Sequence, residues 1–115
     1  MKNLRRVLLV VPRMNIGGAE SHVAQVARAL KSNGWSVEVA SGGGSLAKML
    51  EQEGIRHHWL PIRWGYFFAV WRLKQILENG KFVLVHAHSN AAGPVVAGAV
   101  KDLGIPWIYS AHTGL

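Results

Sequence analysis

The sequence contains no cysteine among its 115 residues, which excludes disulfide bonds and thiolate-ligated zinc sites. A chain without cysteine is compatible with the cytosol, and we expect a cytoplasmic location. Acidic residues are also scarce, because six Asp and Glu stand against thirteen Lys and Arg, for a net charge of +7. This excess of positive charge favours partners that carry phosphate: nucleotides, nucleic acid or an anionic membrane surface.

Long hydrophobic runs and two familiar nucleotide motifs are absent. The longest weakly polar stretch, residues 91–100, falls well short of the roughly 18 residues that cross a bilayer. The first turn lacks the Gly-x-Gly-x-x-Gly pattern of a dinucleotide site, and the second expected strand lacks the acidic residue that would close it. No Gly-Lys-Ser/Thr follows the glycines of the first turn, which excludes a Walker loop. With 50% hydrophobic and only 17% charged residues, the chain should fold as one domain with one core.

Apolar runs alternate with segments of helical periodicity along the whole chain, which predicts repeated βαβ units around a parallel sheet. The expected strands are residues 6–11, 36–40, 57–61, 82–87 and 107–110. The first expected helix begins near residue 19 and ends at 33–34, and the others are 45–53, 66–79 and 93–103. We expect a Rossmann-like, doubly wound α/β fold with strand order 3-2-1-4-5.

Two adjacent glycines, Gly17 and Gly18, lie between the first expected strand and the first expected helix. Neither has a Cβ, so a ligand can approach the backbone, and the helix that follows presents free N–H groups and the positive end of its dipole. The pattern predicts an anion site that suits a phosphate. A purely structural turn is the alternative.

Two later strands end in a histidine followed by a hydroxyl side chain: His88 with Ser89, and His112 with Thr113. Because the carboxyl ends of parallel strands meet at one edge, we expect these residues to reach a ligand at the switch point between the first and fourth strands. The alternative for each histidine is a structural role at the sheet edge.

His86 and His88 are two residues apart on an expected strand, so they point to the same side and could share a metal ion. Few carboxylates lie near them in the expected fold, so we expect no metal. His57 and His58 fall near the start of the third strand, at the opposite edge. We interpret them as structural.

The helix expected at 66–79 has large side chains on both sides. Helical periodicity turns Tyr66, Val70, Leu73 and Leu77 inward. The outward residues are aromatic or basic: Phe67, Phe68, Trp71, Arg72 and Lys74. Such a face suits an anionic membrane or another domain; packing against the loop at residues 63–65, or a shifted register, is the alternative.

Together these features resemble the N-terminal, acceptor-side domain of the retaining, nucleotide-sugar-dependent glycosyltransferases of GT-B architecture, often called family 4. The resemblance spans essentially all 115 residues. Four segments carry it: Gly17-Gly18-Ala19-Glu20, residues 34–39, His86-Ala87-His88 and Ser110-Ala111-His112-Thr113. It implies a single Rossmann-like domain over residues 1–115, truncated before a second domain that holds most of the nucleotide sugar.

The resemblance also implies roles for these residues. Gly17 and Gly18 resemble the glycine loop near the donor diphosphate, His112 resembles the histidine that bonds the transferred sugar, and His88 helps to form the acceptor side, with Ser89 and Thr113 beside the substrate. The implied reaction moves a hexose from a nucleotide sugar to a glycan or lipid-linked acceptor for the cell envelope, without a metal or cofactor, and the fragment alone should be inactive. The alternative is a non-catalytic interaction or membrane-surface module; no recognition motif supports nucleic-acid binding.

Overall fold

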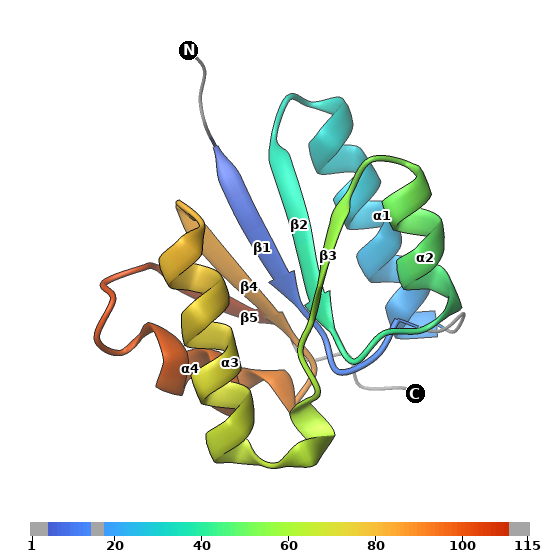
Figure 1. Cartoon of the computed structure of the whole chain (residues 1–115). Coiled ribbons are helices and arrows are strands. Elements are labelled where there is room, and N and C mark those ends of the chain that lie inside the picture. The colour runs from blue at the N-terminus through green and yellow to red at the C-terminus, as the bar shows by residue number, and fades with distance from the viewer. Residues whose placement is uncertain (1–4, 15–17, 111–115) are drawn as a thin grey trace.

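The computed structural model describes residues 5–14 and 18–110. Its centre is a five-stranded, all-parallel sheet in the order β3-β2-β1-β4-β5 (Figure 1). The strands are β1 (Arg6–Val10), β2 (Ser36–Ser41), β3 (Arg56–Trp59), β4 (Leu84–His88) and β5 (Trp107–Ser110). The helices are α1 (Gly18–Ser32), α2 (Ser45–Gln52), α3 (Tyr66–Asn79) and α4 (Ala92–Val100), with a 3₁₀ turn, η1 (Ile62–Trp64), between β3 and α3. The predicted α/β class and strand order are confirmed.

Helices cover both faces of the sheet, α1 and α2 on one and α3 and α4 on the other (Figure 1). Successive side chains of β1 point to opposite faces of the sheet. Val7 and Leu9 join the buried cluster under α1 and α2, while Leu8 and Val10 join the cluster under α3 and α4. Each fully buried aliphatic side chain contributes about 1.5–3 kcal/mol. A strand buried on both faces therefore reads as a continuous apolar run.

Two strand boundaries differ from the prediction by two residues, and the others agree to within one residue. The third strand ends at Trp59 rather than at residue 61, because Leu60 makes its last sheet-like hydrogen bond, to the Ser41 carbonyl (2.7 Å), and Pro61 has no N–H to continue the ladder. The fourth begins at Leu84 rather than at residue 82, where Phe82 is buried in the core.

The register predicted for α3 is wrong at Tyr66, which is 46% exposed, whereas Ala69 and Ile76 are buried beside Leu73 and Leu77. The reason is that α3 packs against α4 as well as against the sheet. A Cβ on Gly98 of α4 would overlap the Tyr66 hydroxyl and lie 3.1 Å from Val70 Cγ2, so these side chains lie across the neighbouring helix.

Within the described residues, no helix combines the length and apolar character needed to cross a membrane.

Candidate functional site

The loops that follow β1 and β2 are joined by backbone hydrogen bonds. The Gly42 N–H donates to the Pro12 carbonyl (2.8 Å), and the Met14 N–H donates to the Gly43 carbonyl (2.9 Å). The Met14 carbonyl in turn accepts two N–H groups from the first turn of α2, at 2.8 and 3.2 Å. Since the protein itself satisfies these helix-terminal donors, the loops and the start of α2 form one rigid unit at the carboxyl edge of the sheet.

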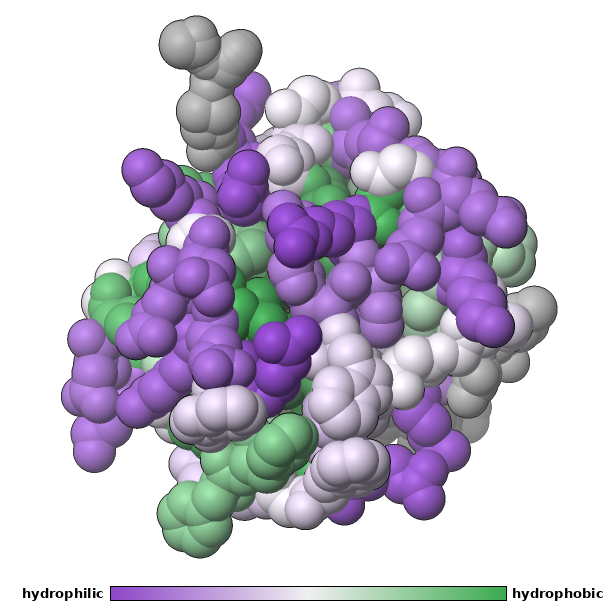
Figure 2. All heavy atoms as spheres, viewed as in Figure 1, coloured by the Kyte–Doolittle hydropathy of each residue, from purple (hydrophilic) through white to green (hydrophobic). Residues whose placement is uncertain are grey.

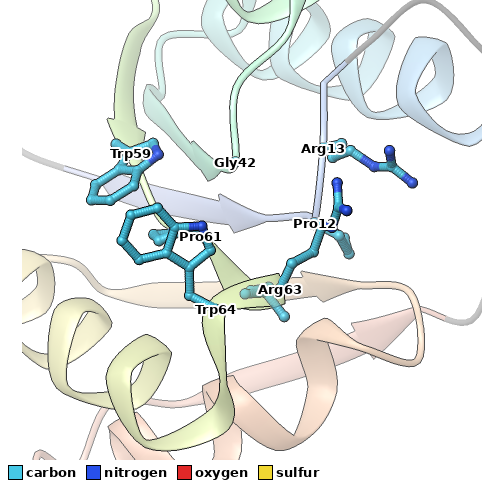
Figure 3. Close-up of a pocket in the computed structure, with 8 residues that line it drawn as sticks. Pro12, Arg13, Gly42, Trp59, Pro61, Arg63 and Trp64 are labelled. Carbon is cyan, nitrogen blue, oxygen red and sulfur yellow. The ribbon is translucent and has the colours of Figure 1, made fainter.

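A pocket of about 370 Å³ opens beside this unit (Figure 3). Its walls come from the loops after β1, β2 and β3 and from η1. Eight residues line it, and we call it the Arg–Trp pocket: Pro12, Arg13, Gly42, Trp59, Pro61, Ile62, Arg63 and Trp64. Three segments that are distant in the chain therefore converge on one concave site.

The Arg–Trp pocket combines aromatic surface with positive charge. The rings of Trp59 and Trp64 meet edge to face, with centroids 5.1 Å apart and planes at 86°. In Figure 3 both rings lie on the side of the pocket opposite Arg13. Neither Arg13 nor Arg63 forms an ion pair with a carboxylate in the described part of the chain. Two guanidinium groups are thus open to an anionic ligand.

Sequence reasoning missed this pocket. Arg13 and Trp59 were not singled out, and Arg63 and Trp64 were considered only as packing partners of α3. The available signal was the position of Arg13 and of Arg63-Trp64 just beyond the first and third expected strands, because loops at the carboxyl edge of a parallel sheet are where ligands bind.

His88 ends β4, the strand beside β1, and is buried. The rings of His86 and His88 are 3.9 Å apart between centroids, which confirms that residues two apart share a side of the strand. His86 Nε2 also lies 2.8 Å from Ser110 Oγ of β5. No group of three or more potential metal ligands occurs among the residues that the structure describes.

Ser89 directly follows β4 and has φ = 92°, a backbone conformation that residues other than glycine seldom adopt. Its N–H donates to the Ser110 carbonyl (2.9 Å), and its carbonyl accepts the Ala92 N–H (3.2 Å) at the start of α4. Strain of this kind is concentrated at functional sites, where the surrounding structure holds it in place.

Gly18 is the first residue of α1, the helix that follows β1, and His88 is the last residue of β4. Val10 of β1 is in register with Ala87 of β4. Both predicted site segments therefore leave the carboxyl ends of neighbouring strands at the switch point. Three predicted site residues, Gly17, His112 and Thr113, lie outside the described residues, and their roles stay predictions.

Two histidines of β3, His57 and His58, are engaged in part-buried polar contacts. His58 Nε2 lies 2.6 Å from Glu38 Oε1, and Arg6 Nε lies 3.5 Å from the other carboxylate oxygen. The hydrogen bond from His58, followed by the nearby positive charges, lowers the pKa of the buried Glu38 carboxyl. His57 Nε2 lies 2.7 Å from Ser41 Oγ, and burial lowers the pKa of its ring. These contacts fit a structural role.

The outward face of α3 divides into two parts. Phe67 is 84% exposed and Trp71 is also exposed, and Figure 2 shows apolar and weakly polar residues gathered at the end of the molecule where α3 begins. Phe68 is half-buried, with its ring centroid 5.7 Å from that of Trp64, so the predicted alternative of packing against the loop holds for this residue.

The basic residues of this face are engaged within the protein. Arg72 Nε donates to the Trp59 carbonyl (2.8 Å), and Lys74 Nζ lies 3.6 Å from Asp102 Oδ2. Both side chains are half-buried rather than fully outward. Each of these side chains therefore has a partner within the protein, and contact of this face with a membrane stays a prediction.

A doubly wound parallel sheet whose ligand-facing loops meet at one edge defines the class of Rossmann-like binding domains. The sequence places the chain within that class. Residues 16–115 match the model of Glycosyltransferase Family 4, and the chain belongs to this family. No match is found among the curated proteins.

Solved structures show the same fold. A glycosyltransferase from Rickettsia africae is 23% identical with a TM-score of 0.71, over 94% of this chain and 30% of that one. MurG from Acinetobacter baumannii is 19% identical with a TM-score of 0.75, over 97% of this chain and 37% of that one. A hydrogenase C-terminal domain from Pyrococcus furiosus, 20% identical with a TM-score of 0.68, covers 90% of this chain and is itself covered to 88%. This chain thus spans about a third of the two glycosyltransferase structures.

Proposed function

We propose that the chain is the acceptor-side domain of a retaining glycosyltransferase that moves a hexose from a nucleotide sugar to a glycan or lipid-linked acceptor. The observation that carries the proposal is the family match over residues 16–115. The matched segment contains Gly18, the first residue of α1, and His88, the last residue of β4. In this proposal a second domain, outside the present sequence, holds most of the nucleotide sugar.

The chemistry of transfer requires that the diphosphate leaving group be stabilised as negative charge develops on it. Preorganised N–H groups and cationic side chains can supply that stabilisation. The start of α1 at Gly18 contributes about 0.3–2 kcal/mol toward a bound anion, against about 8 kcal/mol or more for a typical enzyme. We therefore expect efficient transfer only when both domains are present.

His112 is assigned to the transferred sugar, near the reacting carbon, and His88, Ser89 and Thr113 to the substrate side of the same edge. The test is His112→Ala in the full-length protein, with nucleoside diphosphate release measured on UDP-glucose, UDP-N-acetylglucosamine and GDP-mannose. His22→Ala, on the exposed part of α1, is the matched control. Transfer should be largely lost in the first variant and kept in the second. Unchanged turnover of the His112 variant would remove this residue from the mechanism.

A second role, contact with an anionic membrane at the cytoplasmic surface, is favoured by the exposed rings of Phe67 and Trp71. Aromatic side chains are enriched at membrane interfaces, and such contact would bring a lipid-linked acceptor to the domain. The test is sedimentation with vesicles of phosphatidylcholine and phosphatidylglycerol at low salt. Phe67→Ser with Trp71→Ser should abolish binding, whereas absence of binding by the unmodified protein would rule this role out.

A further inference from the structure

The Arg–Trp pocket lies at the carboxyl edge of the sheet but on the β3 side of β1, whereas the predicted residues His88 and Ser89 lie at the end of β4 on the other side. Its walls are held by backbone hydrogen bonds, from Gly42 to Pro12 (2.8 Å) and from Trp64 to Pro61 (3.0 Å). The two prolines restrict the backbone further. The site is thus largely formed before a ligand arrives. At about 370 Å³ it falls at the small end of the usual range of about 300–1,000 Å³, which suits one sugar-sized group.

The charge of the pocket favours phosphate. Some cations of the protein are neutralised by carboxylates: Arg28 bonds Glu53 through two nitrogens at 2.7 and 2.8 Å, and Lys74 lies 3.6 Å from Asp102. Arg13 and Arg63, both exposed, form no such pair with the described carboxylates. Guanidinium groups present several donors in one plane, which matches the oxygens of a phosphate.

The aromatic wall favours a sugar ring next to that phosphate. Trp59 is 43% exposed and Trp64 is 69% exposed, so both indoles present apolar surface to water. The ring centroid of Phe68 lies 6.3 Å from that of Trp59 and 5.7 Å from that of Trp64, which supports both rings from behind. When the C–H face of a pyranose covers such a surface, apolar area of both the sugar and the indole rings is removed from water.

We propose that the Arg–Trp pocket binds a phosphorylated hexose, with the phosphate between Arg13 and Arg63 and the sugar ring on Trp59 and Trp64. The biological meaning of this binding rests on the proposed function. Within that function, a sugar phosphate is the chemical class of the acceptor. The sugar phosphate can be free or esterified to a lipid. Binding itself is independent of transfer and is measured without a donor.

The experiment is calorimetric titration of the full-length protein with glucose 1-phosphate, inorganic phosphate, glucose and the octyl phosphodiester of glucose. Glucose 1-phosphate should bind at least tenfold more tightly than inorganic phosphate or glucose alone. Tighter binding of the octyl diester than of glucose 1-phosphate indicates a lipid-linked acceptor, and the reverse order indicates a free sugar phosphate. Equal binding of glucose 1-phosphate and inorganic phosphate overturns the proposal, since the aromatic wall then contributes nothing.

Variants separate the two halves of the pocket. Arg63→Gln should weaken glucose 1-phosphate and inorganic phosphate about tenfold each, whereas Lys48→Gln, the same charge change at an exposed position of α2, should weaken neither. Trp64→Ala should weaken glucose 1-phosphate about tenfold and leave inorganic phosphate unchanged, with Trp71→Ala as its control.

Equal effects of Arg63→Gln and Lys48→Gln mean that only net charge matters and overturn the site. Circular dichroism of each variant checks that it folds, and Trp64→Phe, which keeps an aromatic ring, should retain most of the binding if Trp64→Ala does not fold. A protein that binds glucose 1-phosphate but transfers no sugar contradicts the proposed function alone. A protein that transfers sugar but binds no sugar phosphate contradicts this inference alone.

Discussion

The contact between the loops after β1 and β2 leaves no room for a side chain at Gly42. A Cβ at this position would lie 2.9 Å from the Pro12 carbonyl oxygen, closer than Cβ atoms and backbone oxygens normally approach. The position of a Cβ is fixed by its own backbone and the oxygen belongs to the main chain, so no rotation of a side chain can relieve the clash. Gly42→Ala must therefore push the two loops apart.

The size of the effect follows from the two contacts that are disturbed. Overpacking of a well-packed site costs about 1–3 kcal/mol. Separation of the loops also strains the hydrogen bond from the Gly42 N–H to the Pro12 carbonyl, now 2.8 Å long, and a backbone hydrogen bond contributes about 0.5–1.5 kcal/mol. We expect Gly42→Ala to lower the free energy of unfolding by about 2–4 kcal/mol, and to weaken glucose 1-phosphate because Pro12 and Arg13 move.

Urea unfolding followed by circular dichroism measures the first effect, and calorimetric titration measures the second. Gly34→Ala is the matched control. Gly34 has φ = +90° with nothing within 4 Å of its Cβ position, so this variant carries backbone strain of about 1–2 kcal/mol but lies away from the pocket. It should lose stability and keep its ligand affinity. If Gly42→Ala leaves both the free energy of unfolding and the affinity unchanged, the loops are not held as described.

Three further outcomes follow from the structure. Burial lowers the pKa of His57, and the hydrogen bond from His58 lowers the pKa of Glu38, so as the pH falls the unfolded chain takes up these protons before the folded protein does. The free energy of unfolding should therefore be steady above pH 6.5, drop below it, and drop again below pH 4.5. A urea-unfolding series that is flat from pH 7 to about pH 5 would contradict this. Gly98→Ala should be neutral or raise the melting temperature, because its Cβ meets the far end of the flexible Tyr66 side chain and alanine gains about 0.8–1 kcal/mol of helix propensity; a clear loss in a thermal melt would show that Tyr66 cannot move. Leu73→Ala should cost about 2–5 kcal/mol by urea unfolding, since Leu73 is fully buried, and a cost under about 1 kcal/mol would mean that α3 is not packed on the core.

The fold was predictable because its main signals are local. Continuous apolar runs mark strands that are covered on both faces, and the connections between parallel strands fix which edge carries the loops. Residues such as Val7 and Leu8 need no tertiary information to be assigned to opposite faces of a strand. For the same reason the position of His88 at the end of β4 could be read from the sequence.

The details that failed depend on contacts between elements. The helical period of α3 turns Tyr66 inward, whereas in the structure this side chain lies over Gly98 of the neighbouring helix α4 and is 46% exposed. The Arg–Trp pocket escaped notice for a related reason. Arg13 and Trp59 are far apart along the chain, and they line one pocket only because β2 lies between β1 and β3 in the sheet. No short stretch of sequence therefore contains both.

The exposed indoles of Trp59 and Trp64 also give the protein an optical reporter of its own. Indole emission moves to shorter wavelength when water around the ring is replaced, and these two of the five tryptophans stand at the mouth of the pocket. Occupancy of the pocket should therefore be visible as a blue shift in intrinsic fluorescence, without a label or a coupled enzyme. Screening of candidate acceptors can begin with a fluorimeter.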